Sequence, residues 1–169
     1  MRSNAKFYAP SGTPWITSSA TSNSIITRAD EFVTPEAIAA HRLKVYPKGT
    51  LLMAMYGEGK TRGQVSVLGI PATVNQACAA ISVDERKASK HFIKMTLQAN
   101  YLVMRELAEG GNQPNLNLSK IKDFELLLPA LQEQNNIVRR VDALFALANR
   151  IEARCVAART HAQRLAPQL

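Results

Sequence analysis

The stretch from Ala54 to Thr61 has residue types and spacings that could bind a nucleotide phosphate. Its sequence, AMYGEGKT, fits a loose form of the Walker A pattern, with alanine in place of the first glycine. A phosphate-binding loop of that kind needs a helix that begins at the Lys-Thr pair, because the helix N-terminus supplies amide groups and a favourable dipole. Here RGQVSV follows, which breaks a helix and starts a strand. We therefore do not expect nucleotide hydrolysis at this loop.

The same loop is better suited to contact with nucleic acid. Its tip carries Lys60, Thr61 and Arg62, whose side chains can donate hydrogen bonds to phosphate. Tyr56 and Gln64 stand at its base, where their polar groups can reach base edges. The alternative interpretation is a solvated turn whose cations only keep the chain soluble. The residues alone leave both interpretations open.

No arrangement typical of an enzyme is found elsewhere. The sequence lacks a close cysteine and histidine pair, a serine in a nucleophile elbow and the Pro-Pro-aromatic motif with which adenine methyltransferases hold a flipped base. Cys78 and Cys155 lie far apart, and the three histidines are scattered, so we expect reduced thiols and no metal site. Two amide pairs, at 75–76 and 112–113, could pair with adenine edges, although amides in turns also satisfy nearby backbone groups. We expect no cofactor and no catalysis by this chain alone.

Composition indicates a globular body with an appendage. Of the 169 residues, 46% are hydrophobic and 20% are charged, which suffices to bury a core. The net charge of +8 favours a polyanionic partner such as nucleic acid. No apolar run approaches the length of a membrane span, and the first residues lack an apolar signal core. We expect a cytoplasmic protein without membrane contact.

The body of the chain is predicted to be rich in strands. Residues 1–24 have the composition of a loop anchored by Trp15, and the Thr34-Pro35-Glu36 sequence predicts a short helix over 35–41. Strand patterns cover residues 50–56, 64–68, 72–74, 78–83 and 122–128, with a hairpin turn at 57–63. A helical region over 89–109, with a break near Asn100, precedes an amide-rich turn at 112–117. The predicted fold class is therefore α+β.

The C-terminal stretch, residues 129–165, carries a heptad pattern. Apolar or small residues recur at alternating spacings of four and three, and we predict that they pair with another helix: Ile137, Val141, Leu144, Ala148, Ile151, Cys155 and Ala158, followed by Ala162 and Leu165. About 34 helical residues give a rod of about 50 Å, longer than a small domain. An ordinary core helix with one solvated face is the alternative.

Five blocks of sequence, in this order, resemble a known family. They are YPKGTLL at 46–52, MYGEGKTRG at 55–63, IPATVNQA at 70–77, EGGNQPNL at 109–116 and LPALQEQ at 128–134, and a long helix follows them. Together they resemble the specificity subunit of type I restriction-modification systems, from about Trp15 to the C-terminus.

That resemblance implies a fold and a set of partners. Such a subunit carries two target recognition domains, each followed by a long helix; the two helices lie antiparallel as a spacer, and each domain reads half of a split sequence in double-stranded DNA. The subunit recruits methylation subunits, which the restriction subunit joins. By this resemblance, residues 1–128 form a target recognition domain and 129–169 a spacer and dimerisation helix. The residues that we predict to bind DNA are Trp15, Thr17, Tyr56, Lys60, Thr61, Arg62 and Gln64.

The sequence also departs from the family pattern. It holds one recognition domain and one helix, so it resembles half of the subunit: a natural half subunit, a truncated reading frame or an excised fragment. The strands that usually precede the Pro14-Trp15-Ile16 segment are missing or replaced by residues 1–13. We expect a homodimer that pairs through the long helix and reads a symmetric split site. The alternative is an interaction protein that pairs or docks through this helix and no longer reads DNA.

Overall fold

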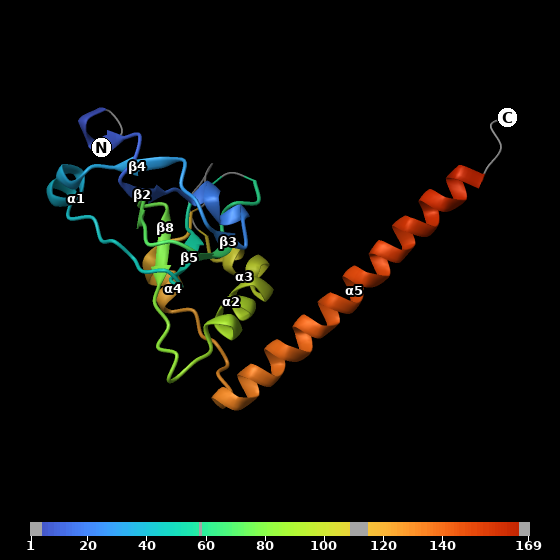
Figure 1. The fold of residues 1–169 in the computed structure, drawn as a ribbon. Helices are drawn as coiled ribbons and strands as arrows, with labels where there is room; N and C mark the ends of the chain where they lie inside the picture. Colours follow the sequence, from blue (N-terminus) through green and yellow to red (C-terminus); the bar gives the residue numbers. More distant parts are fainter. Residues whose placement is uncertain (1–4, 58, 109–114, 166–169) are drawn as a thin grey trace. The chain divides into compact units, whose positions relative to one another are not determined.

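The computed structural model describes residues 5–57, 59–108 and 115–165, the side chain of the last residue excepted. The chain divides into two compact units, residues 1–127 and residues 128–169. Unit 1 is a mixed structure of short strands and helices, and unit 2 consists mainly of one long helix (Figure 1). The α+β class and the long C-terminal helix predicted from the sequence are thus confirmed.

Unit 1 contains two four-stranded sheets within the described residues. The first has the order β1 (Tyr8–Ala9), β4 (Glu31–Val33), β2 (Thr13–Ile16) and β7 (Thr73–Val74). The second has the order β3 (Ile25–Ile26), β6 (Val65–Leu68), β5 (Leu51–Ala54) and β8 (Cys78–Ile81). β5 is antiparallel to both of its neighbours, β6 and β8. In contrast, β7 lies parallel to β2, and β3 lies parallel to β6. Each sheet therefore mixes the two kinds of pairing.

Strand β5 is buried along its whole length and separates two parts of the core. Successive side chains of a strand point to opposite faces of the sheet. Leu52 lies opposite Ser66 and Ala80 and belongs to the cluster that also contains Ile16 of the other sheet. Met53 belongs to a second cluster, with side chains from the helices that follow β8. One strand therefore holds the two sheets together on one face and binds the helices on the other.

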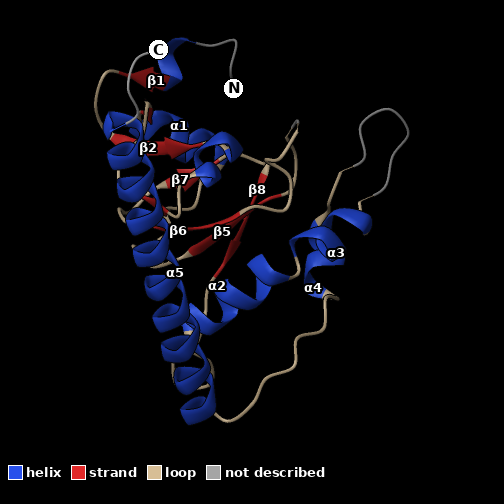
Figure 2. Ribbon diagram, turned by 90° about the vertical axis from the view of Figure 1, so that its right-hand side faces the viewer, coloured by secondary structure: helices blue, strands red, loops and turns tan. Residues whose placement is uncertain are grey.

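The helices of unit 1 cover the outer faces of the sheets. α1 (Pro35–His41) packs through Ala37 against Trp15 and Val33 of the first sheet, and its Thr34 side chain accepts a hydrogen bond from the Ala37 amide at 3.3 Å. α2 (Lys90–Ala99) and α3 (Tyr101–Glu106) follow one another and pack on the second sheet through Leu97 and Met104 (Figure 2). α4 (Leu118–Lys122) and the 3-10 helices η1 (Ala5–Phe7) and η2 (Ser18–Ser22) complete the unit.

Unit 2 is dominated by α5 (Leu131–Leu165), a helix of 35 residues. At 1.5 Å per residue it is about 50 Å long. At its N-terminus the Gln134 side chain donates a hydrogen bond to the Pro129 carbonyl at 2.8 Å, and the Gln134 amide donates to the Ala130 carbonyl at 3.0 Å. Among the residues that the structure describes, none of the helices has the length and apolar composition that a membrane span requires.

Several local predictions agree with the structure. The helix over residues 35–41 has the predicted bounds, and β5 and β6 form the predicted antiparallel hairpin. The helical region from residue 89 onward breaks at Asn100, whose side chain donates a hydrogen bond back to the Thr96 carbonyl at 2.9 Å. An asparagine in this position satisfies the end of one helix and allows the next to start at a new angle.

Other local predictions are wrong. Residues 122–128 form no strand. Lys122 ends a short helix, which Asn117 caps by accepting a hydrogen bond from the Lys120 amide, and residues 123–128 have no strand partner. Residues 72–74 do not continue the sheet of the hairpin but pair with β2 in the other sheet. The N-terminal 24 residues contain β1, β2 and η2 where we expected only loop. The first half of the turn predicted at 112–117 lies outside the described residues.

The central position of β5 makes a testable prediction about stability. Replacement of the fully buried Leu52 by alanine removes side-chain volume from the contact between the two sheets. Loss of buried volume of this kind costs about 2–5 kcal/mol of unfolding free energy. Urea titration followed by circular dichroism measures this loss. The matched control is Leu102→Ala at a largely exposed position of α3, which should change the free energy by less than about 0.5 kcal/mol; equal losses in both variants would contradict the central role of β5.

Candidate nucleic-acid interface

Side chains of α3 form hydrogen bonds with the turn that joins β5 to β6. The Tyr101 hydroxyl donates a hydrogen bond to the Lys60 carbonyl at 2.8 Å, and Arg105 Nη1 donates to the Arg62 carbonyl at 3.0 Å. Gly63 adopts a φ of +86°, which favours glycine, and lies against the side chains of both α3 residues. These contacts hold the backbone carbonyls of Lys60 and Arg62, while the Lys60 side chain is exposed to solvent.

The residues predicted to bind DNA occupy different environments. Lys60 is exposed, Tyr56 is 37% exposed, and Thr61, Arg62 and Gln64 are half-buried. The Oε1 atom of Gln64 is buried and has no hydrogen-bond partner among the described residues, so it points away from any ligand at the surface. Among these residues, the hairpin therefore presents one exposed cation, Lys60, and the partly exposed ring of Tyr56.

The two predicted residues of the N-terminal segment have mainly structural surroundings. Trp15 is only 8% exposed and packs with Val33 and Ala37, so its ring supports the surface from within. Thr17 is half-buried, and its Oγ1 lies 2.8 Å from the Ser19 hydroxyl. We therefore leave Trp15 out of the residues proposed to contact DNA directly.

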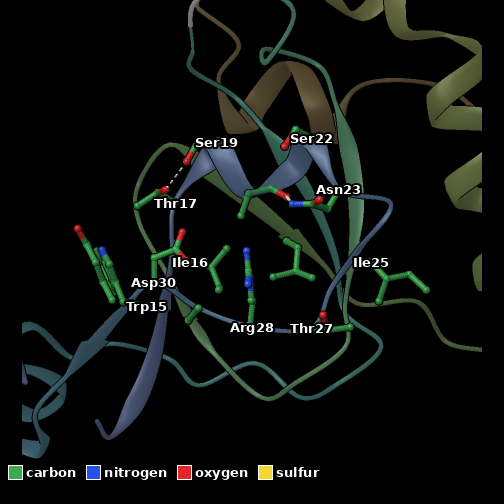
Figure 3. Close-up of a pocket in the computed structure, with 14 residues that line it drawn as sticks. Trp15, Ile16, Thr17, Ser19, Ser22, Asn23, Ile25, Thr27, Arg28 and Asp30 are labelled. Carbon is green, nitrogen blue, oxygen red and sulfur yellow. Dashed lines mark hydrogen bonds between the residues drawn. The ribbon is translucent and has the colours of Figure 1, made fainter. Parts of the chain in front are cut away.

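Thr17 belongs to a polar hollow of about 520 Å³ between β2, η2 and the segment that follows β3. Figure 3 shows the Arg28 side chain pointing into this hollow, with Thr17 and Ser19 at one edge and Asn23 at another. Its lining also contains the carboxylates of Asp30 and Glu31, which would repel a phosphate group. The hollow is therefore less suited to nucleic acid than a surface without carboxylates would be.

A larger cleft of about 920 Å³ lies between the α1–β5 connection, the β7–β8 turn and the start of the hairpin turn. We call it the aromatic cleft, because three tyrosine rings line it together with cations and amides, and none of its described lining residues is acidic. Its polar and aromatic lining consists of Tyr8, Trp15, Ser18, His41, Arg42, Lys44, Tyr46, Tyr56, Asn75 and Gln76. For duplex DNA, the cations of such a surface can bind phosphates, and its hydroxyl and amide groups can form hydrogen bonds with base edges.

One wall of the aromatic cleft is formed by the connection after α1. Arg42 ends the helix in the left-handed region, with a φ of 48°, and the Leu43 amide donates a hydrogen bond to the Ile38 carbonyl at 3.0 Å. The Lys44 ammonium lies 5.1 Å from the centre of the Tyr46 ring. Tyr46 is bonded in both directions to the backbone of Ala72, at 2.8 and 3.0 Å. Arg42 and Lys44 therefore belong to a backbone segment that is hydrogen-bonded, through Tyr46, to the residue before β7.

The opposite wall is the β7–β8 turn, which is joined to both sheets. The Asn75 amide donates a hydrogen bond to the Ile16 carbonyl at 2.9 Å, and the Met55 amide donates to the Ala77 carbonyl at 2.7 Å. Within the turn, Asn75 Oδ1 accepts from the Ala77 amide at 3.1 Å. The Asn75 side chain thus stabilises the turn itself, as the alternative interpretation of this amide pair expected.

On the other side of the hairpin, a second basic region adjoins the turn. The Lys94 ammonium of α2 donates hydrogen bonds to the Ser24 carbonyl at 2.9 Å and to the Ser24 hydroxyl at 2.6 Å. Burial lowers the pKa of Lys94 from its usual value. A hollow of about 440 Å³ here is lined by Lys60, Tyr101 and small polar side chains, and the described residues that form it include no carboxylate. On both sides of the hairpin turn, the described lining residues thus include no carboxylate.

Sequence reasoning missed the contribution of two segments. It did not single out Arg42, Lys44 and Tyr46, although the close spacing of two cations and a tyrosine was a usable signal. It also missed Tyr101 and Arg105, which have no local signal because their role depends on the packing of α3 under the turn. In the described ranges, His, Cys, Asp and Glu side chains do not gather in groups of three or more that could hold a metal ion.

Comparison with known proteins matched residues 1–156 to the family described as type I restriction modification DNA specificity domain. The EcoR124I/EcoR124II specificity subunit of Escherichia coli is 22% identical over 152 residues, which cover 89% of this chain and 38% of that protein. The MjaIX specificity subunit of Methanocaldococcus jannaschii is 28% identical over 130 residues, which cover 73% of this chain and 29% of that protein. The chain therefore spans well under half the length of these relatives.

A solved structure shares the fold. The HsdS subunit from Thermoanaerobacter tengcongensis matches with a TM-score of 0.68 at 16% sequence identity, over 89% of this chain and 34% of that one. At this identity the likeness concerns the arrangement of the backbone.

The position of Cys78 in the aromatic cleft leads to a prediction about the reactivity of its thiol. Cys78 lies in its wall, and burial raises the pKa of this thiol to about 12. Because the thiolate is the reactive form, a raised pKa leaves Cys78 protonated at pH 8. In a Cys155→Ser variant, we expect iodoacetamide at pH 8 to label less than a tenth of the folded protein, and to label it fully in urea. Rapid labelling of the folded variant, measured by mass spectrometry, would contradict the burial of this thiol.

Proposed function

We propose that this chain, which belongs to the family of type I restriction modification DNA specificity domains, is the part of a specificity subunit that reads one half of a split DNA target. The observation that carries the proposal is the surface formed by the hairpin turn and the aromatic cleft. Cations, tyrosine rings and amides meet there, and none of the described lining residues is acidic. The net charge of +8 supports the same partner, double-stranded DNA.

The two parts of this surface would contribute differently. The exposed Lys60 and its neighbour Arg62 would bind phosphates, which places the domain on the duplex without reading its sequence. The tyrosines and amides of the aromatic cleft would contact the bases. Because α3 holds the backbone carbonyls of Lys60 and Arg62 before any ligand binds, these two residues would lose less conformational entropy on binding.

Under this proposal the chain acts by recognition and assembly, and the chemistry belongs to its partners. It would present the bound duplex to a methylation subunit, and the restriction subunit would join through that complex. Relatives of this chain carry the name of specificity subunits of type I restriction enzymes. Neither a catalytic residue nor a cofactor is part of this proposal.

Helix α5 would supply the second contact, with another long helix. The predicted pairing residues Leu144 and Ile151 are 66% and 51% exposed, and Phe145 and Leu147 flank them with exposed side chains. A strip of exposed apolar side chains on a charged helix is typical of an interaction surface. We propose that two copies pair antiparallel along this strip, which presents two recognition domains to a symmetric split site.

The exposed strip also favours a second candidate function. A chain that docks or pairs through α5 without reading DNA would need only this helix. The two candidates differ in one property, which is specific binding of duplex DNA by unit 1.

Removal of the hairpin cations should weaken DNA binding and reduce its dependence on salt concentration. Each phosphate contact contributes about 0.9 to the slope of log K against log salt concentration. The variant Lys60→Ala with Arg62→Ala should therefore bind duplex DNA more weakly and lower this slope by roughly 0.9 for each of the two cations that contacts a phosphate. Fluorescence anisotropy at four salt concentrations measures both values.

The control for this prediction is Lys48→Ala with Lys87→Ala, which removes the same charge from exposed positions outside the cleft and the hairpin. It should leave the slope close to that of the unaltered chain. If both double variants lower the slope equally, the hairpin is a solvated turn and only net charge matters.

Charges placed in the α5 strip should separate the proposed dimer. Leu144→Glu with Ile151→Glu places two carboxylates where the helices would meet, and burying unpaired charges is strongly unfavourable. We expect light scattering to give twice the chain mass for the unaltered protein and one chain mass for the variant. Ala146→Glu with Ala153→Glu, on the opposite side of the helix, is the matched control and should remain dimeric. A dimer that survives the first pair of substitutions would rule out pairing through this strip.

A further inference from the structure

Gln76 has a position that distinguishes it from the other amides of the chain. It stands in the β7–β8 turn, between Asn75 and Ala77, whose backbones are bonded to the two sheets of unit 1. A side chain on this turn therefore starts from a fixed backbone position. Direct readout of bases depends on such fixed geometry, because a hydrogen-bonding group that is displaced by about 1 Å no longer matches a base edge.

The side chain of Gln76 is also available for a ligand. It is exposed, and in the part of the chain that the structure describes no hydrogen bond involves its amide. The neighbouring Asn75 differs, since its Oδ1 accepts from the Ala77 amide and maintains the turn. The other predicted amide reader, Gln64, has its Oε1 buried beneath the surface. Gln76 is therefore the amide of this region that can both donate and accept toward a bound molecule.

The surroundings of Gln76 are suited to a duplex. It shares the aromatic cleft with Arg42 and Lys44, which can bind the phosphates that flank a contacted base. Tyr46 and Tyr56 line the same cleft and offer ring surface and hydroxyl groups. The described lining includes no carboxylate that would repel the DNA backbone. An acidic segment of a protein partner would also be attracted to the cations, but it would give no role to a neutral amide.

We propose that Gln76 is a specificity-determining residue that reads an adenine in the major groove of the DNA target. A glutamine amide can donate and accept at the same time: its carbonyl accepts from the adenine N6 amino group while its amino group donates to the adenine N7. The other three bases do not offer this pair of groups in that order. This inference rests on the proposed function, since it assigns one base position to a surface already proposed to bind DNA.

The test is a selection from a randomised duplex library. The full chain, together with its cognate methylation subunit, is incubated with duplexes of about 40 base pairs, long enough for a split site about one to two helical turns apart, and bound sequences are enriched and read. For the unaltered chain we expect a split motif that contains adenine at the position read by Gln76. Gln76→Ala should lose the preference at that position in each half-site, by about fivefold to a hundredfold, and keep the rest of the motif.

A second variant makes the test sharper. Gln76→Glu replaces the amide with an acceptor of the same length, which accepts from the cytosine N4 amino group. We expect the preferred base at the same position to change from adenine to cytosine. Gln163→Ala, at an exposed glutamine of α5, is the control and should leave the whole motif unchanged.

The outcomes distinguish this inference from the function on which it rests. A motif that is the same for the unaltered chain and both Gln76 variants would overturn the role of Gln76 and leave the proposed function intact. The role of Gln76 in base reading is also overturned if Gln76→Ala weakens only the association with the methylation subunit, which would make the cleft a protein-binding surface. If the unaltered chain enriches no motif, the proposed function fails and this inference fails with it.

Discussion

The burial of strand β5 on both faces is the constraint on which unit 1 depends. Leu52 joins it to the other sheet and Met53 joins it to α2 and α3, so the strand cannot shift without opening both parts of the core. A shift in pairing by one residue would exchange these two side chains between the faces. The hairpin turn and Tyr56 follow directly from this strand. The position of the proposed DNA-binding surface is therefore set by the best-buried element of the fold.

Recognition then uses elements that are short but firmly attached. The β7–β8 turn is bonded to β2 on one side and to the residue after β5 on the other, which holds Gln76 over the cleft. Two side chains of α3 fix the carbonyls of the hairpin turn. The described backbone at the edges of the surface is thus ordered by hydrogen bonds that leave Lys60 and Gln76 exposed to solvent. Helix α5, with its exposed apolar strip, suits a different task, the contact with another helix.

Elements with strong local signals could be predicted from the sequence, and those defined by tertiary contacts could not. The sequence signals for the Thr34-Pro35 cap, for the hairpin and for α5 each lie within a continuous stretch of residues, and each of these elements was predicted correctly. β1 and β3 have only two residues each, too few for an alternating pattern, and they exist because a longer strand lies beside them. The strand at 72–74 was predicted, but its pairing with β2 in the other sheet was not. The hairpin cations were identified from sequence, whereas the aromatic cleft was not, because the turn at 75–76 and the α1–β5 connection meet only in the folded chain.

Binding of duplex DNA by unit 1, through the cleft and the hairpin turn, is the central claim. Amide hydrogen exchange, measured by mass spectrometry with and without a saturating duplex, tests this claim most directly. We expect slower exchange on binding in peptides that contain residues 41–46, 59–63 and 75–78, and little change along α5 beyond its first turns. Slower exchange confined to α5, or no change anywhere in unit 1, would contradict the claim and leave the helix as the functional part of the chain.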